Sequence, residues 1–265
     1  MSHRYLVIDS SAFTSPQLEV YLSARPKNRV IISDSTAVQL FQPEQWVTAR
    51  NGLFKQYKDR IFFSDSSGPI LQAELEGRKP SILAAPLTRA FNATIAAEGE
   101  EEARQLAYIH KNLLDIEDEY LANRKVFLNT LITHMSKALQ DNPAVIQDRD
   151  AAIHLAAATA QRGLAKGFSP SLLDAPYSVF LKAYPLAARY VALLASLLVE
   201  HIQATGTAAK VNATAIIETF TQRDNVLIAS LFDGLLSTDE NTNAAFVALK
   251  QTLAVLSKVG AQSVH

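Results

Sequence analysis

The sequence predicts an α/β fold: a Rossmann-like, three-layer domain with a parallel sheet, interrupted by a long, all-helical insertion. Short β-branched or aromatic runs alternate with helical segments over the first 70 residues. Such alternation is typical of parallel sheets. Residues from 70 to 205 contain no clear strand pattern, and the strand–helix pattern returns after them.

The N-terminal part contains three apolar strands separated by helices. Pro16 stands where the first helix begins, a position that proline favours. Arg25-Pro26-Lys27-Asn28 forms a turn, and Pro43 opens a later helix. The predicted order is strand 5–9, helix 16–24, strand 29–33, helices 36–41 and 43–58, and strand 60–64.

Helical periodicity dominates the middle of the chain. Asn142-Pro143 ends the first long helix, and the turn Thr205-Gly206-Thr207 ends the helical region. We therefore expect residues 1–70 and 206–265 to form the α/β domain and 71–205 to form the insertion. The later elements are predicted as helices 98–141, 144–164, 177–204, 213–220, 222–231 and 241–257, with one strand at 234–238.

Composition excludes several classes of protein. The chain has 265 residues, 48% of them hydrophobic, which is enough for a sizeable core. It contains no cysteine, so disulfides, thiolate catalysis and cysteine-bound zinc are excluded. The apolar stretch 187–202 contains Arg189 and Glu200 and is shorter than a membrane span. We expect a buried helix there, no membrane partner and a cytoplasmic location.

An aspartate follows each predicted strand. Asp9, Asp34, Asp65 and Asp239 stand at these ends, and the carboxyl ends of parallel strands share one edge of the sheet. Clustered carboxylates repel one another unless a cation neutralises them, and hard oxygen ligands select Mg²⁺ or Mn²⁺. The alternative for Asp34 and Asp65 is that each caps the helix that follows it.

Three short motifs resemble those of PIN-domain nucleases. They are VIDSSAF (7–13), D-x-x-x-I-A-S (224–230) and L-L-S-T-D (235–239). The resemblance covers the two ends of the chain and not its helical middle. It implies that Asp9, Asp224 and Asp239 hold Mg²⁺ or Mn²⁺ and are catalytic, with Ser11 and Thr238 as supporting polar residues.

One position departs from that family. PIN domains usually carry a glutamate on the helix after the second strand, and the matching residue here is Gln39. A glutamine carbonyl can ligate a hard cation, but it brings no charge. Asp34, Asp65 or the acidic stretch 115–119 could supply the missing ligand; for that stretch, a solvated helix face is the alternative.

Two functions from different classes follow. The first is a metal-dependent ribonuclease, in which a metal-bound water hydrolyses phosphodiester bonds of single-stranded or structured RNA. The second is a catalytically degenerate PIN-like module for RNA or protein binding and assembly, with self-association or a protein partner on the helical insertion. The ribonuclease requires the Asp9, Asp224 and Asp239 carboxylates to converge, whereas the module allows them to be separated, ion-paired or covered.

Two further features bear on partners. Basic residues cluster near the predicted turns at 25–29, 50–60 and 78–79, where they could contact phosphates. A third alternative is a Rossmann-like domain that acts on an unrelated small molecule, although the sequence contains no glycine motif of the kind that binds phosphate.

Overall fold

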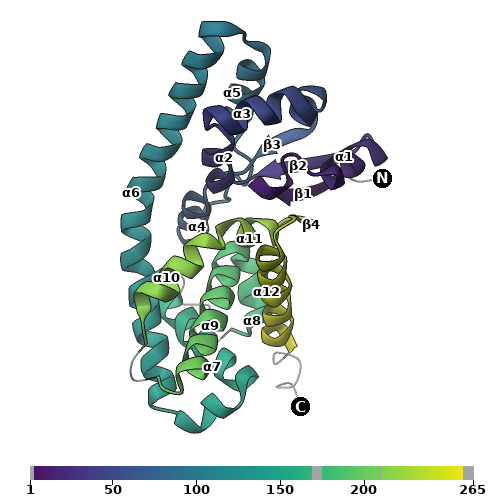
Figure 1. Cartoon of the computed structure of the whole chain (residues 1–265). Helices are drawn as coiled ribbons and strands as arrows, with labels where there is room; N and C mark the ends of the chain where they lie inside the picture. The colour runs from purple at the N-terminus through teal and green to yellow at the C-terminus, as the bar shows by residue number, and fades with distance from the viewer. Residues whose placement is uncertain (1–2, 169–174, 209–210, 259–265) are drawn as a thin grey trace. The chain divides into compact units, whose positions relative to one another are not determined.

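The computed structural model describes residues 3–168, 175–208 and 211–258 (Figure 1). The chain forms two compact units, which are described separately below. Unit 1 comprises Met1–Ile70, Ser81–Leu121 and Ile228–Ala244, and unit 2 comprises Leu71–Pro80, Ala122–Leu227 and Ala245–His265. Residues 81–121, expected in the helical insertion, belong to unit 1, whereas 206–227 and 245–265, expected in the α/β domain, belong to unit 2.

Unit 1 contains a four-stranded sheet in which every pair of neighbouring strands is parallel, as predicted. The chain is therefore an α/β protein with a parallel sheet and a long helical region. The strand order is β3-β2-β1-β4. The strands are β1 (Arg4–Ile8), β2 (Asn28–Ile32), β3 (Ile61–Phe63) and β4 (Gly234–Leu236).

The register brings the carboxyl ends of the four strands level with one another. Ile8 pairs with Ile32 of β2 and with Leu236 of β4, and Ile32 pairs with Phe63 of β3. Gly234 opens β4 at a close approach, where an added Cβ atom would lie 3.2 Å from the Leu6 side chain. The acids that follow the strands are thereby presented along a single edge.

The helices α1 (Pro16–Ala24), α2 (Asp34–Leu40) and α3 (Pro43–Ala49) connect the first three strands. The Ser15 hydroxyl caps α1 by accepting from the Gln17 amide at 3.1 Å. Residues 43–58 do not form the single helix predicted for them. The α-helix ends at Ala49, and Gly52 has non-helical backbone angles (φ −96°, ψ −130°).

An aromatic cluster forms much of the core of unit 1. Phe41 stacks on the single tryptophan, Trp46, with ring centroids 5.5 Å apart. Phe91 packs against Trp46 and Phe63. Phe91 comes from α5 (Ala85–Ala96). Four helices contribute residues to both units: α4 (Ser67–Leu75), α6 (Gly99–Gln140), α11 (Asp224–Ala229) and α12 (Glu240–Lys258).

In unit 2, α9 (Pro185–Thr205) is the central helix and packs against three others. Alanines 152, 156 and 160 of α7 are fully buried, and such small side chains allow helices to approach closely. Among described residues, α9 alone is long and apolar enough to span a membrane, and 78% of its most apolar stretch is buried. The three neighbours are α7 (Arg149–Phe168), α8 (Tyr177–Ala183) and α10 (Ala213–Gln222).

Two predicted helices of this region have different boundaries. The single helix expected at 177–204 is broken at Tyr184, and Pro185 begins α9. Pro143–Gln147 forms a short 3-10 helix before α7. The last helices, α11 (Asp224–Ala229) and α12 (Glu240–Lys258), lie close to their predicted ranges.

Candidate functional site

Asp9 lies directly after β1 and is only 7% exposed. Its Oδ1 accepts a hydrogen bond from the Ser11 hydroxyl at 2.5 Å, and its Oδ2 accepts one from the Ser237 hydroxyl. Both carboxylate oxygens therefore have hydroxyl donors. One of these donors comes from the end of β4, so the Asp9 carboxylate ties the ends of β1 and β4 together.

Ser237 also connects Asp9 to Asp239. The Asp239 amide donates to the Ser237 hydroxyl at 3.0 Å, and the Thr238 amide donates to the Ser11 hydroxyl at 2.9 Å. Two of the three predicted metal-binding aspartates are thus joined through one serine. Sequence reasoning missed Ser237, although a hydroxyl residue directly after a strand and two places before Asp239 was the available signal.

The Asp239 side chain is exposed and caps α12. Its Oδ2 accepts from the Thr242 hydroxyl at 2.5 Å and from the Thr242 amide at 2.9 Å. These two hydrogen bonds, the hydroxyl first, hold the pKa of the Asp239 carboxyl below its usual value. Asp239 therefore has an N-cap role that the helix itself requires.

Asp224 belongs to unit 2, where it forms a buried ion pair with Arg124. Both side chains are 5% exposed. Arg124 also donates to the Tyr190 hydroxyl at 3.0 Å, and its guanidinium lies 5.4 Å from the centroid of the Phe220 ring. Burial raises the pKa of Tyr190 to about 12, so this hydroxyl stays neutral beside the ion pair.

A second buried carboxylate of unit 2 was not singled out from the sequence. Glu74 is 5% exposed, and its oxygens accept from the amides of Leu186 and Ala187 at 2.9–3.0 Å. These amides open α9, so Glu74 satisfies donors that a helix N-terminus leaves unpaired. Burial is the main cause that raises the pKa of Glu74.

The three predicted ligands do not form a ready cation site. Each oxygen of Asp9 accepts from a serine hydroxyl, and Asp239 caps a helix. Releasing Asp224 would leave the Arg124 guanidinium buried without its carboxylate. Among described residues, no group of three or more histidine, aspartate or glutamate side chains is placed to hold a metal. A metal role for these aspartates stays a prediction.

The other proposed ligands are dispersed. Gln39 is exposed on α2, and Thr238 is exposed after β4. Asp34 is the first residue of α2, but Ser33 is the residue that caps this helix, through the Thr36 amide. Asp115 is exposed, and the side chains of 117–119 lie outside the described residues.

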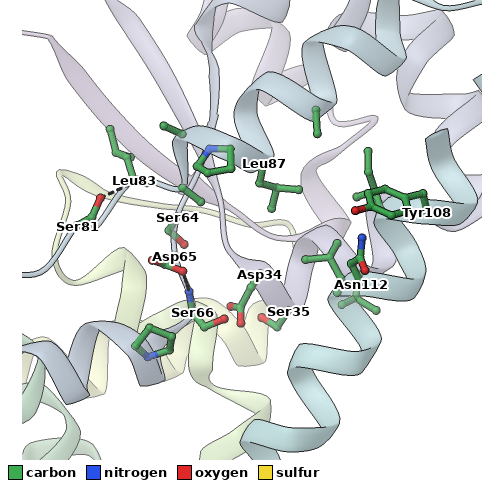
Figure 2. A pocket seen from close by; sticks show the side chains of 18 residues that line it. Asp34, Ser35, Ser64, Asp65, Ser66, Ser81, Leu83, Leu87, Tyr108 and Asn112 are labelled. Atoms are coloured by element: carbon green, nitrogen blue, oxygen red, sulfur yellow. Dashed lines mark hydrogen bonds between the residues drawn. The ribbon is translucent and has the colours of Figure 1, made fainter.

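A pocket of about 800 Å³ opens beside the carboxyl ends of β2 and β3 in unit 1. Asp34, Ser35 and Ser66 gather on one side of it, while Tyr108 and Asn112 face it from α6 (Figure 2). Burial raises the pKa of Asp65, and a hydrogen bond from the Ser66 amide partly offsets this rise. Two of the strand-end aspartates, Asp34 and Asp65, therefore share a pocket that contains neither Asp9 nor Asp239.

Cationic residues gather at the opposite edge of the sheet, where the strands begin. β1 begins at Arg4, and β3 begins directly after Arg60. Arg4 pairs with Asn28 at the start of β2. We call this set of residues the basic edge: Arg4, Arg25, Lys27, Arg29, Lys58 and Arg60.

Hydrogen bonds hold the basic edge together. The Arg60 guanidinium donates to the Arg25 carbonyl at 3.3 Å and lies 5.1 Å from the centroid of the Tyr57 ring. The Arg29 guanidinium donates to the Pro26 carbonyl at 2.6 Å. Two carboxylates lie at the same edge: Asp59 precedes β3, and Asp233, which accepts from the Tyr5 amide, precedes β4. Six cations against two acids leave this edge positive.

No protein-family model, curated protein or solved structure matches this chain. The fold itself defines the class: an α/β protein with a parallel four-stranded sheet.

Proposed function

We propose that this chain is an RNA-binding module with a PIN-like α/β core, and that it binds single-stranded RNA through the basic edge. The observation that carries the proposal is the gathering of six cationic side chains where three parallel strands begin. Several cations on one edge attract a phosphate backbone.

Two observations support the PIN-like assignment of the core. The strand order β3-β2-β1-β4 is Rossmann-like and entirely parallel. Asp9 follows β1 and Asp239 follows its neighbour β4, and the two aspartates are joined through Ser237. In this proposal those aspartates hold the ends of β1 and β4 together, and the edge where the strands end does not contact phosphates.

Fluorescence anisotropy with a labelled uridine oligomer tests RNA binding. We expect Arg4→Glu and Arg25→Glu each to weaken binding about tenfold at low salt, because each reverses one charge at a phosphate-binding edge. The slope of log K against log salt should fall by roughly 0.7 for each phosphate that the variant no longer neutralises. Lys111→Glu, an exposed α6 residue of unit 1, is the matched control and should bind like the native chain.

If Arg4→Glu and Arg25→Glu both bind with native affinity and native salt dependence, RNA binding by this edge is refuted. The same holds if the native chain binds no oligomer at low salt. Uniform weakening by all three variants, the control included, would point to bulk charge in place of a defined site.

A metal-dependent ribonuclease is the second candidate, because Asp9 and Asp239 lie on either side of Ser237. Calorimetric titration with Mn²⁺ separates it from the binding module. The module predicts no heat of binding at millimolar Mn²⁺ and intact RNA after incubation. Stoichiometric binding that Asp9→Asn and Asp239→Asn both abolish, together with RNA cleavage, would establish the ribonuclease.

A further inference from the structure

The pocket at the ends of β2 and β3 has the dimensions of a small-molecule site. Its volume of about 800 Å³ falls within the range of roughly 300–1,000 Å³ that is usual for ligand pockets. It is built entirely from residues of unit 1, contributed by α2, the segment 64–69 after β3, the segment 81–90 and α6. Its position at the carboxyl edge of a parallel sheet is where open α/β folds bind ligands.

The lining of the pocket is acidic on one side and apolar on the other. Asp34 and Asp65 supply the charge, whereas Leu83, Leu87 and Ile109 contribute to the apolar wall. No lysine, arginine or histidine is among the described residues that line it. An anionic ligand would meet two carboxylates with no cation to offset them, so the charge of the site favours a cationic ligand.

One polar group inside the pocket lacks a partner. Ser64 is 1% exposed, and among the residues that the structure describes none forms a hydrogen bond with its hydroxyl. A buried hydroxyl without a partner is costly, and a ligand that hydrogen-bonds it removes that cost. Ser64 and Asp65 both line the pocket, so one ligand head group can lie beside both residues.

We propose that this pocket binds a small organic cation, an ammonium group attached to an apolar body. The Asp65 carboxylate pairs with the ammonium, the Ser64 hydroxyl accepts a hydrogen bond from it, and the apolar body lies against Leu83, Leu87 and Ile109. The basic edge lies at the other end of the strands, so this inference does not rest on RNA binding.

Calorimetry with three probes of one shape tests the inference. Phenethylamine, phenethyl alcohol and phenylpropionate share an apolar body and differ in the charge of the head group. We expect the amine to bind the native chain about tenfold more tightly than the alcohol, as one desolvated charge pair would produce, and the anion not to bind. In Asp65→Asn, which keeps the shape of the side chain, the amine and the alcohol should bind equally.

Asp59→Asn is the matched control, because Asp59 is an exposed aspartate of unit 1 outside the pocket. It should keep the native preference for the amine. Asp34→Asn serves as a second variant if Asp65→Asn does not fold, as judged by Trp46 fluorescence.

The inference is overturned if the amine does not bind the native chain at millimolar concentration. It is also overturned if the alcohol or the anion binds as tightly as the amine, or if both pocket variants keep the native preference. Displacement of the amine by an equimolar amount of Mn²⁺ would assign the pocket to a metal ion instead.

Discussion

Asp224 in unit 2 and Asp9 in unit 1 are aspartates for which the sequence predicts one shared role, yet their surroundings differ. Asp224 is buried against a guanidinium, with an aromatic ring over the same cation. Asp9 is almost as deeply buried but has two serine hydroxyls as partners. The helical unit neutralises its carboxylate with a full charge, whereas the sheet edge satisfies its carboxylate with hydrogen bonds alone.

The difference shows that the partner of a buried carboxylate determines how much stability is lost when one of the two residues is replaced. Removal of one member of a buried ion pair leaves an uncompensated charge, which is among the most damaging changes to a protein interior. Removal of an acceptor leaves hydroxyl donors unsatisfied, which costs less. Removal of an exposed helix cap such as Asp239 costs the least stability, because water can take the place of the carboxylate.

The largest expected effect follows from Arg124→Ala. This change leaves the Asp224 carboxylate buried without its cation and should destabilise unit 2 by about 3–5 kcal/mol. Hydrogen exchange of the α9 amides, which belong to unit 2, measures the loss.

The double variant Arg124→Met/Asp224→Leu is the control, because it removes both charges and fills the space with apolar groups. It should recover most of the lost stability. An Arg124→Ala variant as stable as the native chain would contradict the structural role of the pair. Recovery of that variant on addition of Mn²⁺ would instead favour the ribonuclease, in which Asp224 holds a metal.

Asp9→Ala is expected to have the next largest effect. It leaves the hydroxyls of Ser11 and Ser237 without their acceptor, so we expect unit 1 to lose about 2 kcal/mol. Trp46 lies in the core of unit 1, and urea unfolding followed by its fluorescence measures this unit alone.

Asp9→Asn should lose less than Asp9→Ala, because the amide keeps one carbonyl acceptor and can donate to the second serine. Equal losses in the two variants would show that the negative charge of Asp9, and not its hydrogen bonds, stabilises the ends of β1 and β4.

Glu74 makes a smaller, pH-dependent contribution. Because burial raises its pKa in the folded state, folded Glu74 keeps its proton to higher pH than in the unfolded chain. The stability of unit 2 should therefore fall as pH rises from about 4.3, the ordinary glutamate pKa, through the raised value. Urea unfolding followed by circular dichroism at several pH values measures this fall. Glu74→Gln should remove the part of the pH dependence that Glu74 contributes. An unchanged pH profile in Glu74→Gln would contradict the assignment.

The smallest effect is expected at Asp239, where the sign is reversed. Because hydrogen bonds from Thr242 lower its pKa, the cap is present above the ordinary aspartate value and is lost as pH falls through the lowered one. NMR titration of the carboxyl should place its midpoint below about 3.9. Thr242→Val should raise that midpoint, because it removes the hydroxyl donor. A midpoint that does not move would mean that the hydroxyl does not donate to Asp239 in solution.

Local signals predicted much of the fold. The helix at 16–24 was predicted with its observed boundaries, because Pro16 marks its start and a turn follows Ala24. The four strands were located within a few residues because each is a short apolar run between turn residues. The break before Pro185 was not predicted. The apolar periodicity continues on both sides of it and favoured a single helix, although proline is common at the first position of a helix.

The candidate site was much harder to predict, because its hydrogen bonds and ion pairs join distant parts of the chain. Asp9 and Ser237 are 228 residues apart, and Arg124 and Asp224 are 100 residues apart. Nothing local marks Arg124, in the middle of a long helix, as the partner of Asp224. The capping alternative also failed for Asp34, because the preceding Ser33 caps α2.

The pairing of β1 with β4 has a consequence for the order in which the chain folds during synthesis. The first three strands are complete by Phe63, but β4 begins only at Gly234. At about 5–20 residues per second, the ribosome needs roughly 10–35 s to reach the fourth strand after the third. During that interval one side of β1 has no neighbouring strand, and an open strand edge invites association with other chains. The nascent protein therefore passes through a period in which shielding by a chaperone would matter most.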